Sequence, residues 1–320
     1  MADGGGKSAQ MNTRAQIRVL ADGRVHMHDG PIDLIIEAFG VGLEVKRAYQ
    51  AAAERFLNVL DELCTELGFL RQPAREDGTL PNGSVARRMM LAVRPHAARS
   101  FITPMAAVAG AVAEEILDVM TASATLTRAY VNDGGDIALH LAPGEKFVIG
   151  MAEYEECSEP TVQTARNVGH PPSLFGTTTI GFDDAIRGIA TSGWQGRSFS
   201  LGIADAVTVL ADKASMADAA ATMIANAVDL PESSKILRRA ACDMAPDSDL
   251  GERLVTQAVG PLSLDEIKIA LEGGIREAEV LHASGLIRSA AIHLQGETRV
   301  VGALKPMLYN SASAGSLIHA

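Results

Sequence analysis

Residues 190–211 read ATSGWQGRSFSLGIADAVTVLA and residues 130–141 read YVNDGGDIALHL, and the two stretches are built alike. In both, apolar strand-like residues run directly into glycines, small hydroxyl side chains and carboxylates. A buried strand that ends in such residues delivers a polar loop to a pocket. A third stretch, ADAAATMIANAV at residues 217–228, follows closely. We therefore expect function to reside in these stretches.

The order of the remaining elements predicts the fold class. Alternating apolar residues around Asp22-Gly23 predict a hairpin of residues 16–20 and 24–28. Apolar residues that recur every three or four positions predict helices, whereas short apolar stretches joined by turn residues predict strands. We expect helices at 41–67, 84–93, from 103 onward, 216–228 and 264–281, and further strands at 126–131, 137–141, 146–151, 177–182, 187–191, 204–210, 286–294 and 298–304.

Along the chain, the expected helices thus follow one another in groups, and so do the expected strands, which are joined by connections as short as those of hairpins. This pattern favours an α+β fold, with a mostly antiparallel sheet packed against helices, over a doubly wound parallel sheet. We expect residues 1–15 to form a flexible N-terminus and residues 16–320 a single domain. The polar, proline-containing segment 153–176 is expected to be a lid or an insertion.

Composition excludes several classes of partner. The net charge of −11 argues against nucleic acid, which requires a clustered basic face. No apolar run reaches the roughly 18 residues of a membrane span, so we expect neither a membrane partner nor export. Cys64, Cys157 and Cys242 lie far apart, which argues against a zinc site or a disulfide framework and favours a cytoplasmic location.

Two loops carry the side chains best suited to ligand binding. The first contains two carboxylates, an amide and two glycines, which suit hydrogen bonding to a heterocycle or a ribose; the alternative is an ordinary Asp/Gly turn. The second contains the single tryptophan, whose face can stack on a ring, and an arginine that can hold a phosphate or a carboxylate. These candidates are Asn132, Asp133, Gly134, Gly135 and Asp136 in the first loop, and Thr191, Ser192, Gly193, Trp194, Gln195, Gly196, Arg197 and Ser198 in the second.

Asp218 and Thr222 lie four residues apart on an expected helix, so both side chains leave one face of it. Together with a backbone carbonyl they would form an all-oxygen site for magnesium or calcium. The same spacing is equally consistent with a structural role, in which Asp218 caps the helix and Thr222 only packs against its neighbours. Thr103 offers a capping hydroxyl directly before a proline at a helix start. The amides of Met105 and Ala106 there would face an anionic ligand; the alternative is that the small residues of this helix serve only close packing against the sheet.

The order VNDGGDI, TSG, VTVLA and then AD with a Thr four residues after the Asp resembles the ApbE superfamily. Members of that superfamily are magnesium-dependent enzymes that transfer FMN from FAD onto a protein threonine, and their fold is related to the T-fold. The closest resemblance is to an uncharacterised cytoplasmic branch. By position, Asn132 to Asp136 match the glycine-rich loop and Thr191 to Gly193 the TSG turn. Asp218 and Thr222 match the metal pair, with Ala106 at the helix start that supplies a backbone carbonyl.

The chain departs from the transferases at two points. It lacks the His and Pro that follow the TSG turn, and it has Ala109 where they carry a lysine.

Three hypotheses therefore stay open: a magnesium- and flavin-dependent enzyme, an enzyme of this scaffold acting on a smaller carboxylated heterocycle, and a non-catalytic binding subunit. In the enzyme hypotheses the catalytic residues are Arg197, Ser198, Asp133 and Asp136. The expected partners are a small-molecule ligand, a flavinylated acceptor protein and a second copy of the chain.

Overall fold

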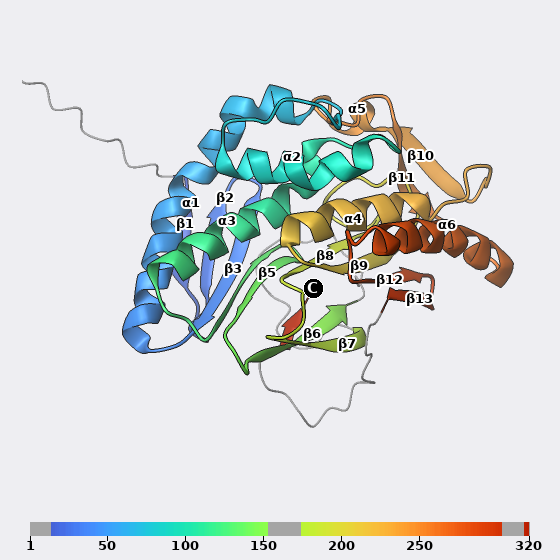
Figure 1. Ribbon diagram of the computed structural model, residues 1–320. Helices are drawn as coiled ribbons and strands as arrows, with labels where there is room; N and C mark the ends of the chain where they lie inside the picture. Colours follow the sequence, from blue (N-terminus) through green and yellow to red (C-terminus); the bar gives the residue numbers. More distant parts are fainter. Residues whose placement is uncertain (1–13, 153–173, 303–316, 320) are drawn as a thin grey trace, which may run out of the picture.

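Nine strands form the central sheet of the computed structural model, which describes residues 14–152, 174–302 and 317–319 (Figure 1). All neighbouring strands in this sheet run antiparallel, as the hairpin-length connections predict. The order of strands is β1 (Gln16–Val19), β2 (Val25–Asp29), β3 (Ile32–Phe39), β4 (Arg128–Asp133), β5 (Asp136–Leu141), β8 (Gly188–Ser192), β9 (Ala206–Ala211), β12 (Ser289–Leu294) and β13 (Glu297–Gly302). The α+β fold class is therefore confirmed.

Helices cover one face of the sheet, and a smaller sheet covers part of the other (Figure 1). The helical elements are α1 (Gly42–Leu70), α2 (Ser84–Ala97), the 3-10 helix η1 (Pro104–Ala107), α3 (Val108–Ser123), α4 (Ala214–Ala227), α5 (Ala241–Met244) and α6 (Leu264–Ala283). The small sheet has the order β14 (Leu317–His319), β6 (Lys146–Ala152) and β7 (Leu174–Gly181), and β10 (Ile236–Ala240) and β11 (Leu254–Val259) form a separate ribbon.

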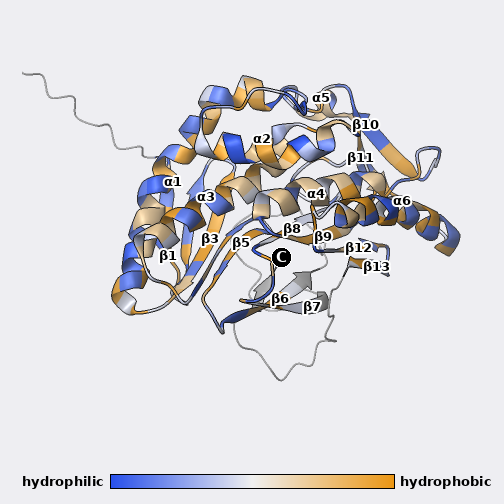
Figure 2. Cartoon of the chain, in the orientation of Figure 1, coloured by the Kyte–Doolittle hydropathy of each residue, from blue (hydrophilic) through white to orange (hydrophobic). Residues whose placement is uncertain are grey.

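The sheet separates two sets of core residues. On β4, Val131 belongs to the core beneath the helices, whereas Tyr130 packs with Phe147 and Ile180 of the small sheet. Because side chains alternate along a strand, the same rule places Asp133 on the helix side. Figure 2 shows α1 and α2 alternating between hydrophilic and hydrophobic residues, as expected for helices at the solvent boundary.

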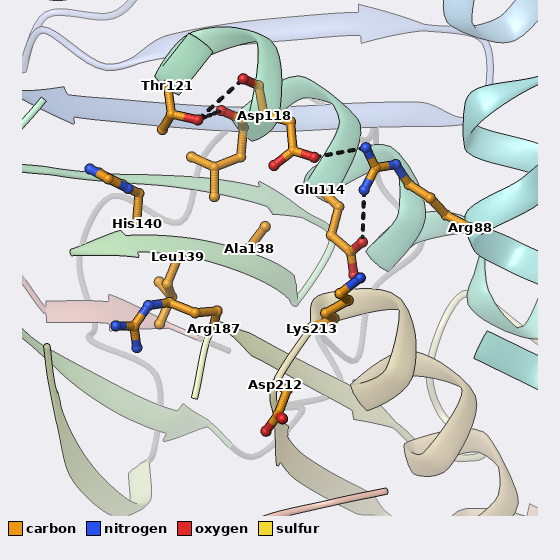
Figure 3. A pocket seen from close by; sticks show the side chains of 11 residues that line it. Arg88, Glu114, Asp118, Thr121, Ala138, Leu139, His140, Arg187, Asp212 and Lys213 are labelled. Atoms are coloured by element: carbon orange, nitrogen blue, oxygen red, sulfur yellow. Dashed lines mark hydrogen bonds and ion pairs between the residues drawn. The ribbon is translucent and has the colours of Figure 1, made fainter. Parts of the chain in front are cut away.

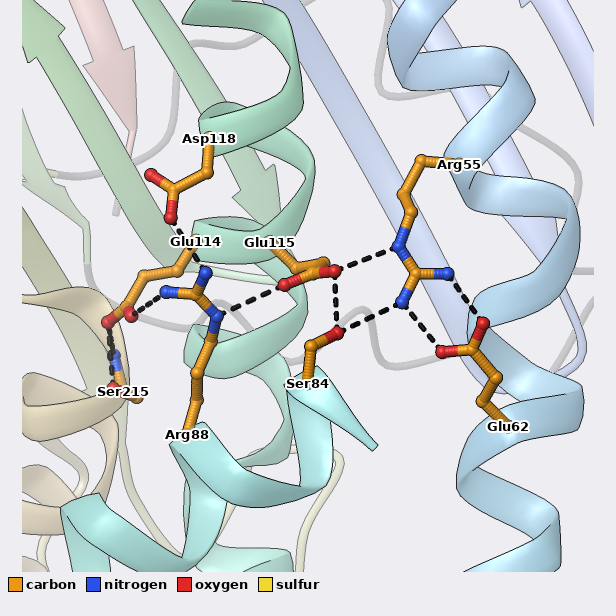
Figure 4. Close-up of polar contacts among 8 residues, drawn as sticks. All are labelled: Arg55, Glu62, Ser84, Arg88, Glu114, Glu115, Asp118 and Ser215. Atoms are coloured by element: carbon orange, nitrogen blue, oxygen red, sulfur yellow. Dashed lines mark hydrogen bonds and ion pairs between the residues drawn. The ribbon is translucent and has the colours of Figure 1, made fainter. Parts of the chain in front are cut away.

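Ion pairs fasten the helices above this core (Figure 4). Arg88 of α2 contacts Glu114 (3.3 Å), Glu115 (3.1 Å) and Asp118 (2.7 Å), all on α3. Glu114 also accepts hydrogen bonds of 2.7 Å from the backbone amide and the hydroxyl of Ser215, at the start of α4. The network extends to α1 and to the start of α2 through Arg55, Glu62 and Ser84.

Several boundaries differ from the sequence prediction. Helix α2 runs through Pro95 to Ala97, although we expected it to end at residue 93, shortly before this proline. The proline removes only the bond to the carbonyl of Leu91, and Leu91 is half exposed (50%), so water can reach this side of the helix. The sequence analysis missed β3 and the ribbon of β10 and β11. Of the expected lid, residues 153–173 lie outside the described residues and the last three begin β7.

None of the described helices combines the length and the apolar character that crossing a bilayer requires.

Helices α3 and α4 come into close backbone contact at Gly110. A Cβ atom at this position would lie 2.4 Å from the carbonyl oxygen of Ala214, so only glycine allows the two backbones to approach this closely. By contrast, a Cβ at Gly68 in α1 would meet no atom within 4 Å.

We therefore predict opposite effects for two glycine substitutions. Gly110→Ala should lower the free energy of unfolding by about 1–3 kcal/mol because the added methyl group overpacks the contact. Gly68→Ala should raise it by about 0.5–1 kcal/mol because alanine favours a helix. Urea denaturation of both variants measures the difference, and a stabilising Gly110→Ala would show that the α3–α4 contact is looser than described.

Candidate functional site

The turn between β4 and β5 places two carboxylates on the helix side of the sheet. Asp133 and Asp136 are paired residues at the ends of the two strands. Between them Gly134 and Gly135 have φ angles of 65° and 113°, which are strained for residues with a side chain. The side-chain oxygen of Asn132 accepts a hydrogen bond of 2.8 Å from the Gly135 amide. The expected polar loop is thus a rigid turn that holds both aspartates at one end of the sheet.

Asp218 reaches the same region from α4. Its Oδ2 accepts a hydrogen bond of 3.0 Å from the amide of Gly110, in the first turn of α3. In an uninterrupted helix this amide would donate to the carbonyl of Ala106, but the backbone breaks at Ala107 (φ −135°, ψ 17°), where η1 meets α3. The break turns the positive end of α3 toward the Asp218 carboxylate.

Burial raises the pKa values of all three carboxyl groups. It raises the pKa of Asp133, which is 4% exposed, to about 7, although the Asp33 amide at 3.4 Å and Arg197 act against the shift. The pKa of Asp136 is also raised, first by burial and then by the nearby charges of Asp218 and Asp133. Burial likewise raises the pKa of Asp218, although the Gly110 amide acts against the shift. Three desolvated carboxyl groups this close together favour a bound proton or cation.

Arg197 lies directly over the β4–β5 turn. A Cβ atom at Gly134 would fall 1.6 Å from a terminal nitrogen of its guanidinium group, so glycine leaves the space that the arginine occupies. The same nitrogen lies 3.8 Å from Asp133 Oδ1, and the side chain remains 56% exposed. The sequence suggested no acidic partner for Arg197, whereas the fold supplies one from a distant strand.

Other residues of the second loop hold it in place. The Thr191 amide donates to Asp136 Oδ1 at 3.3 Å, and the Thr191 hydroxyl bonds that of Thr208 at 2.9 Å. The indole Nε1 of Trp194 donates to Asp205 at 3.0 Å. A turn closes where the amide of Gly196 donates to the carbonyl of Gly193 (3.2 Å).

The remaining candidate residues make few or no contacts with the three carboxylates. The Thr103 hydroxyl donates to Asp249 and makes no capping bond to the 3-10 helix, which corrects the capping role expected for it. The Ala106 amide donates to the Thr103 carbonyl (3.1 Å), so it does not face an anionic ligand. The amide that does face an anionic group belongs to Gly110. Thr222 is partly buried. Among the described residues, the candidates whose side chains form no hydrogen bond or ion pair are Thr222, Met105, Ser192, Gln195 and Ser198.

The donor set suits a hard divalent cation, because all its members are oxygens. Among the described residues no group of three His, Cys, Asp or Glu side chains has the geometry to hold a metal ion. A cation at this site would therefore bind the Asp218 carboxylate with a hydroxyl and a backbone carbonyl. Thr222, one helical turn from Asp218, and Ala106, at the helix start, are the residues that the sequence predicts for these two oxygens.

A cavity of about 280 Å³ lies at the opposite end of β5, β8 and β9 (Figure 3). None of the residues that line it is a site candidate. Its carboxylates already have arginine partners: Glu114 and Asp118 pair with Arg88, and Asp212 forms two bonds, of 2.6 and 2.8 Å, with Arg288 outside the cavity lining. We therefore place the candidate site at the three carboxylates.

Sequence reasoning missed three residues that shape the site. Asp33 donates its amide to Asp133, Gly110 donates to Asp218, and Asp205 binds Trp194. A signal existed only for Asp205, which stands directly before the buried strand AVTVLA. Asp33 and Gly110 act through backbone amides, and every residue type except proline can donate such a bond.

A protein-family model described as AbpE bacteria matches residues 17–300. A UPF0280 protein of Methanopyrus kandleri is 35% identical over 158 residues, which cover 49% of this chain and 54% of that protein. A UPF0280 protein of Methanococcoides burtonii is 38% identical over 130 residues, which cover 40% and 47%. The chain thus spans about half the length of the curated relatives it matches. The crystal structure of Pseudomonas stutzeri flavinyl transferase ApbE, apo form, aligns over 90% of this chain and 93% of its own with a TM-score of 0.38 and 13% identity.

The raised pKa of Asp133 predicts a pH-dependent stability. Its folded pKa of about 7 lies above the unfolded value of about 3.9, so the folded state holds the proton more tightly. This contribution is complete below pH 4 and is lost as the pH rises through 7. The free energy of unfolding should therefore decrease over this range, and Asp133→Asn should weaken the decrease.

Urea denaturation between pH 4.5 and 8 measures this effect. Asp212→Asn, at an exposed position at the opposite end of the sheet, is the control and should keep the wild-type slope. Equal slopes for the wild type and Asp133→Asn would show that Asp133 does not titrate in this range.

Proposed function

The chain belongs to the family described as AbpE bacteria, and on that premise we propose that it is an enzyme that binds a flavin nucleotide or a similar anionic heterocycle beside Asp133, Asp136 and Asp218. The reaction that we propose first is the magnesium-dependent transfer of FMN from FAD to an acceptor protein.

The observation that carries the proposal is the convergence of three desolvated carboxyl groups, each with a raised pKa, at the start of α3. Buried like charges are costly unless protons or a cation neutralise them, so a purely structural role gives no reason to gather them here. Asp218, Thr222 and the Ala106 carbonyl would hold a magnesium ion. Bound there, the ion would neutralise part of the charge of a pyrophosphate.

Arg197 supports recognition of the anionic part of the ligand. Its pairing with Asp133 at 3.8 Å orients the guanidinium group without forming a hydrogen bond short enough to occupy it. More than half of the side chain is exposed, so its remaining N–H groups can bind a phosphate or a carboxylate. Ser198 is exposed beside it and would provide a further hydroxyl.

In the proposed transfer, a hydroxyl oxygen of the acceptor forms a bond with the phosphorus of the FMN half of FAD. The pyrophosphate bond breaks and AMP leaves. The hydroxyl proton would pass to Asp133 or Asp136. Burial raises the pKa values of both carboxyl groups, and the value of about 7 for Asp133 suits a group that accepts a proton near neutral pH.

The same pKa values favour a second candidate function. Asp133 or Asp136 would act as the general base toward a small carboxylated heterocycle, with Arg197 on its carboxylate and Trp194 against its ring. The chain has neither the His-Pro turn nor the lysine of the transferases, which is the sequence feature in favour of this alternative.

The identity of the bound molecule separates the two functions. The purified protein should be incubated with FAD and magnesium, and the products analysed by mass spectrometry. Release of AMP together with flavinylation of an acceptor would support the transferase. A carboxylated heterocycle that co-purifies, with FAD left intact, would support the alternative.

We predict that magnesium stabilises the wild type and not Asp218→Asn. A ligand present at 100 times its Kd adds about 2.7 kcal/mol to the free energy of unfolding. Asparagine keeps an oxygen that can accept the Gly110 amide, so the variant should fold. Thermal unfolding with and without magnesium tests this, with Asp212→Asn as the variant that should respond like the wild type. An equal response of Asp218→Asn would place the cation elsewhere.

We also predict that Arg197→Lys weakens binding of the anionic ligand although it keeps the charge. An ammonium group cannot reproduce the planar pair of donors, and losing such a bond costs about ten- to a hundredfold in affinity. Calorimetric titration with FAD and FMN measures the effect. Arg288→Lys, at the opposite end of the sheet, is the matched control, and an unchanged affinity of Arg197→Lys would assign Arg197 a structural role.

A further inference from the structure

Trp194 is the single tryptophan of the chain, and its indole ring is held by one carboxylate. Asp205 Oδ1 accepts a hydrogen bond of 3.0 Å from the indole Nε1, and the Trp194 amide donates to the Ala204 carbonyl at 3.0 Å. A Cβ atom at Gly193 would lie 2.2 Å from the Asp205 carbonyl oxygen, so the two backbones are in direct contact. The orientation of the ring is therefore set from the segment that precedes β9.

Asp205 is itself fixed by the turn between β12 and β13. Its Oδ2 accepts a hydrogen bond of 2.6 Å from the Gln295 amide, and its own amide donates to the His293 carbonyl at 3.0 Å. Among the residues that the structure describes, Gln295 is the non-glycine residue with a positive φ (42°). Its side chain bonds the Leu262 amide (2.9 Å) and the Gly260 carbonyl (3.0 Å). Strained backbone persists where surrounding contacts determine it, as they do at this turn.

The loop of residues 193–197 is consequently held at both ends. Trp194 is tied to Asp205 at one end, and Arg197 lies over Gly134 beside Asp133 at the other. A loop fixed at two points presents its side chains in one arrangement, which lowers the entropy cost of binding a ligand.

We propose that Asp205 is a positioning residue, which holds the Trp194 indole so that the heterocyclic ring of the ligand stacks on it. The stacking of a ligand ring on Trp194 rests on the proposed function, whereas the fixed orientation of the indole rests on the geometry alone. Asp205 does not touch the ligand and acts only through Trp194.

A double-mutant cycle tests this role with FMN as the probe. Asp205→Ala should reduce the FMN affinity about tenfold in the wild-type background, because the ring loses its fixed orientation. In the Trp194→Phe background, which lacks the Nε1 donor, the same change should cost less than about twofold. Asp212→Ala is the matched control and should not change the affinity. Equal losses in both backgrounds would overturn the proposal.

Intrinsic fluorescence tests the positioning without any ligand. Because all tryptophan emission comes from Trp194, Asp205→Ala should shift the emission maximum to longer wavelength and increase quenching by acrylamide, whereas Asp205→Asn, which keeps one acceptor oxygen, should restore most of the wild-type signal. An unchanged spectrum for Asp205→Ala would overturn the proposal. If wild-type protein bound no FMN, the proposed flavin function would fail, and the fluorescence result would still decide the role of Asp205.

Discussion

The contact between α3 and α4 is the constraint on which the site depends. The backbones meet at Gly110 and Ala214, and each helix supplies the carboxylate that caps the start of the other. Asp218 of α4 accepts the Gly110 amide, and Glu114 of α3 accepts the Ser215 amide. One helix cannot slide past the other without breaking both caps, so the position of Asp218 relative to the sheet is fixed.

The two caps differ in how their charges are balanced. Glu114 lies beside Arg88, an ion pair that neutralises it (Figure 4). Asp218 has the partial positive charge at the start of α3 and, on its other side, the carboxylates of Asp136 and Asp133. The same helix contact therefore produces one cap whose carboxylate pairs with an arginine and one cap whose carboxylate faces two further carboxylates. The second cap is where we propose that the ligand and its cation bind, because binding there would relieve the repulsion between like charges.

Much of the fold follows from local patterns. The Asp22-Gly23 turn, the alternating strands and the two central helices match the prediction to within a few residues. The misses have physical causes. Pro95 stands where the lost carbonyl partner can be hydrated, so the helix continues. The strands β10 (ILRRA) and β11 (LVTQAV) do not alternate strictly between apolar and polar residues, and they pair only with each other, so hydrophobic patterning gives little sign of them.

By itself the sequence determined which residue types are available for chemistry: a rigid Asp/Gly turn, a loop with tryptophan and arginine, and an Asp with a Thr one helical turn away. It could not determine which groups face one another, because pairing between distant strands and helices depends on packing of the whole core. The tertiary structure decided that Arg197 lies over Gly134, that Trp194 is held by Asp205, and that the amide facing a carboxylate belongs to Gly110 and not to Ala106. It also raised the pKa values of the three aspartates, since these shifts arise from burial, and burial is a property of the folded chain alone.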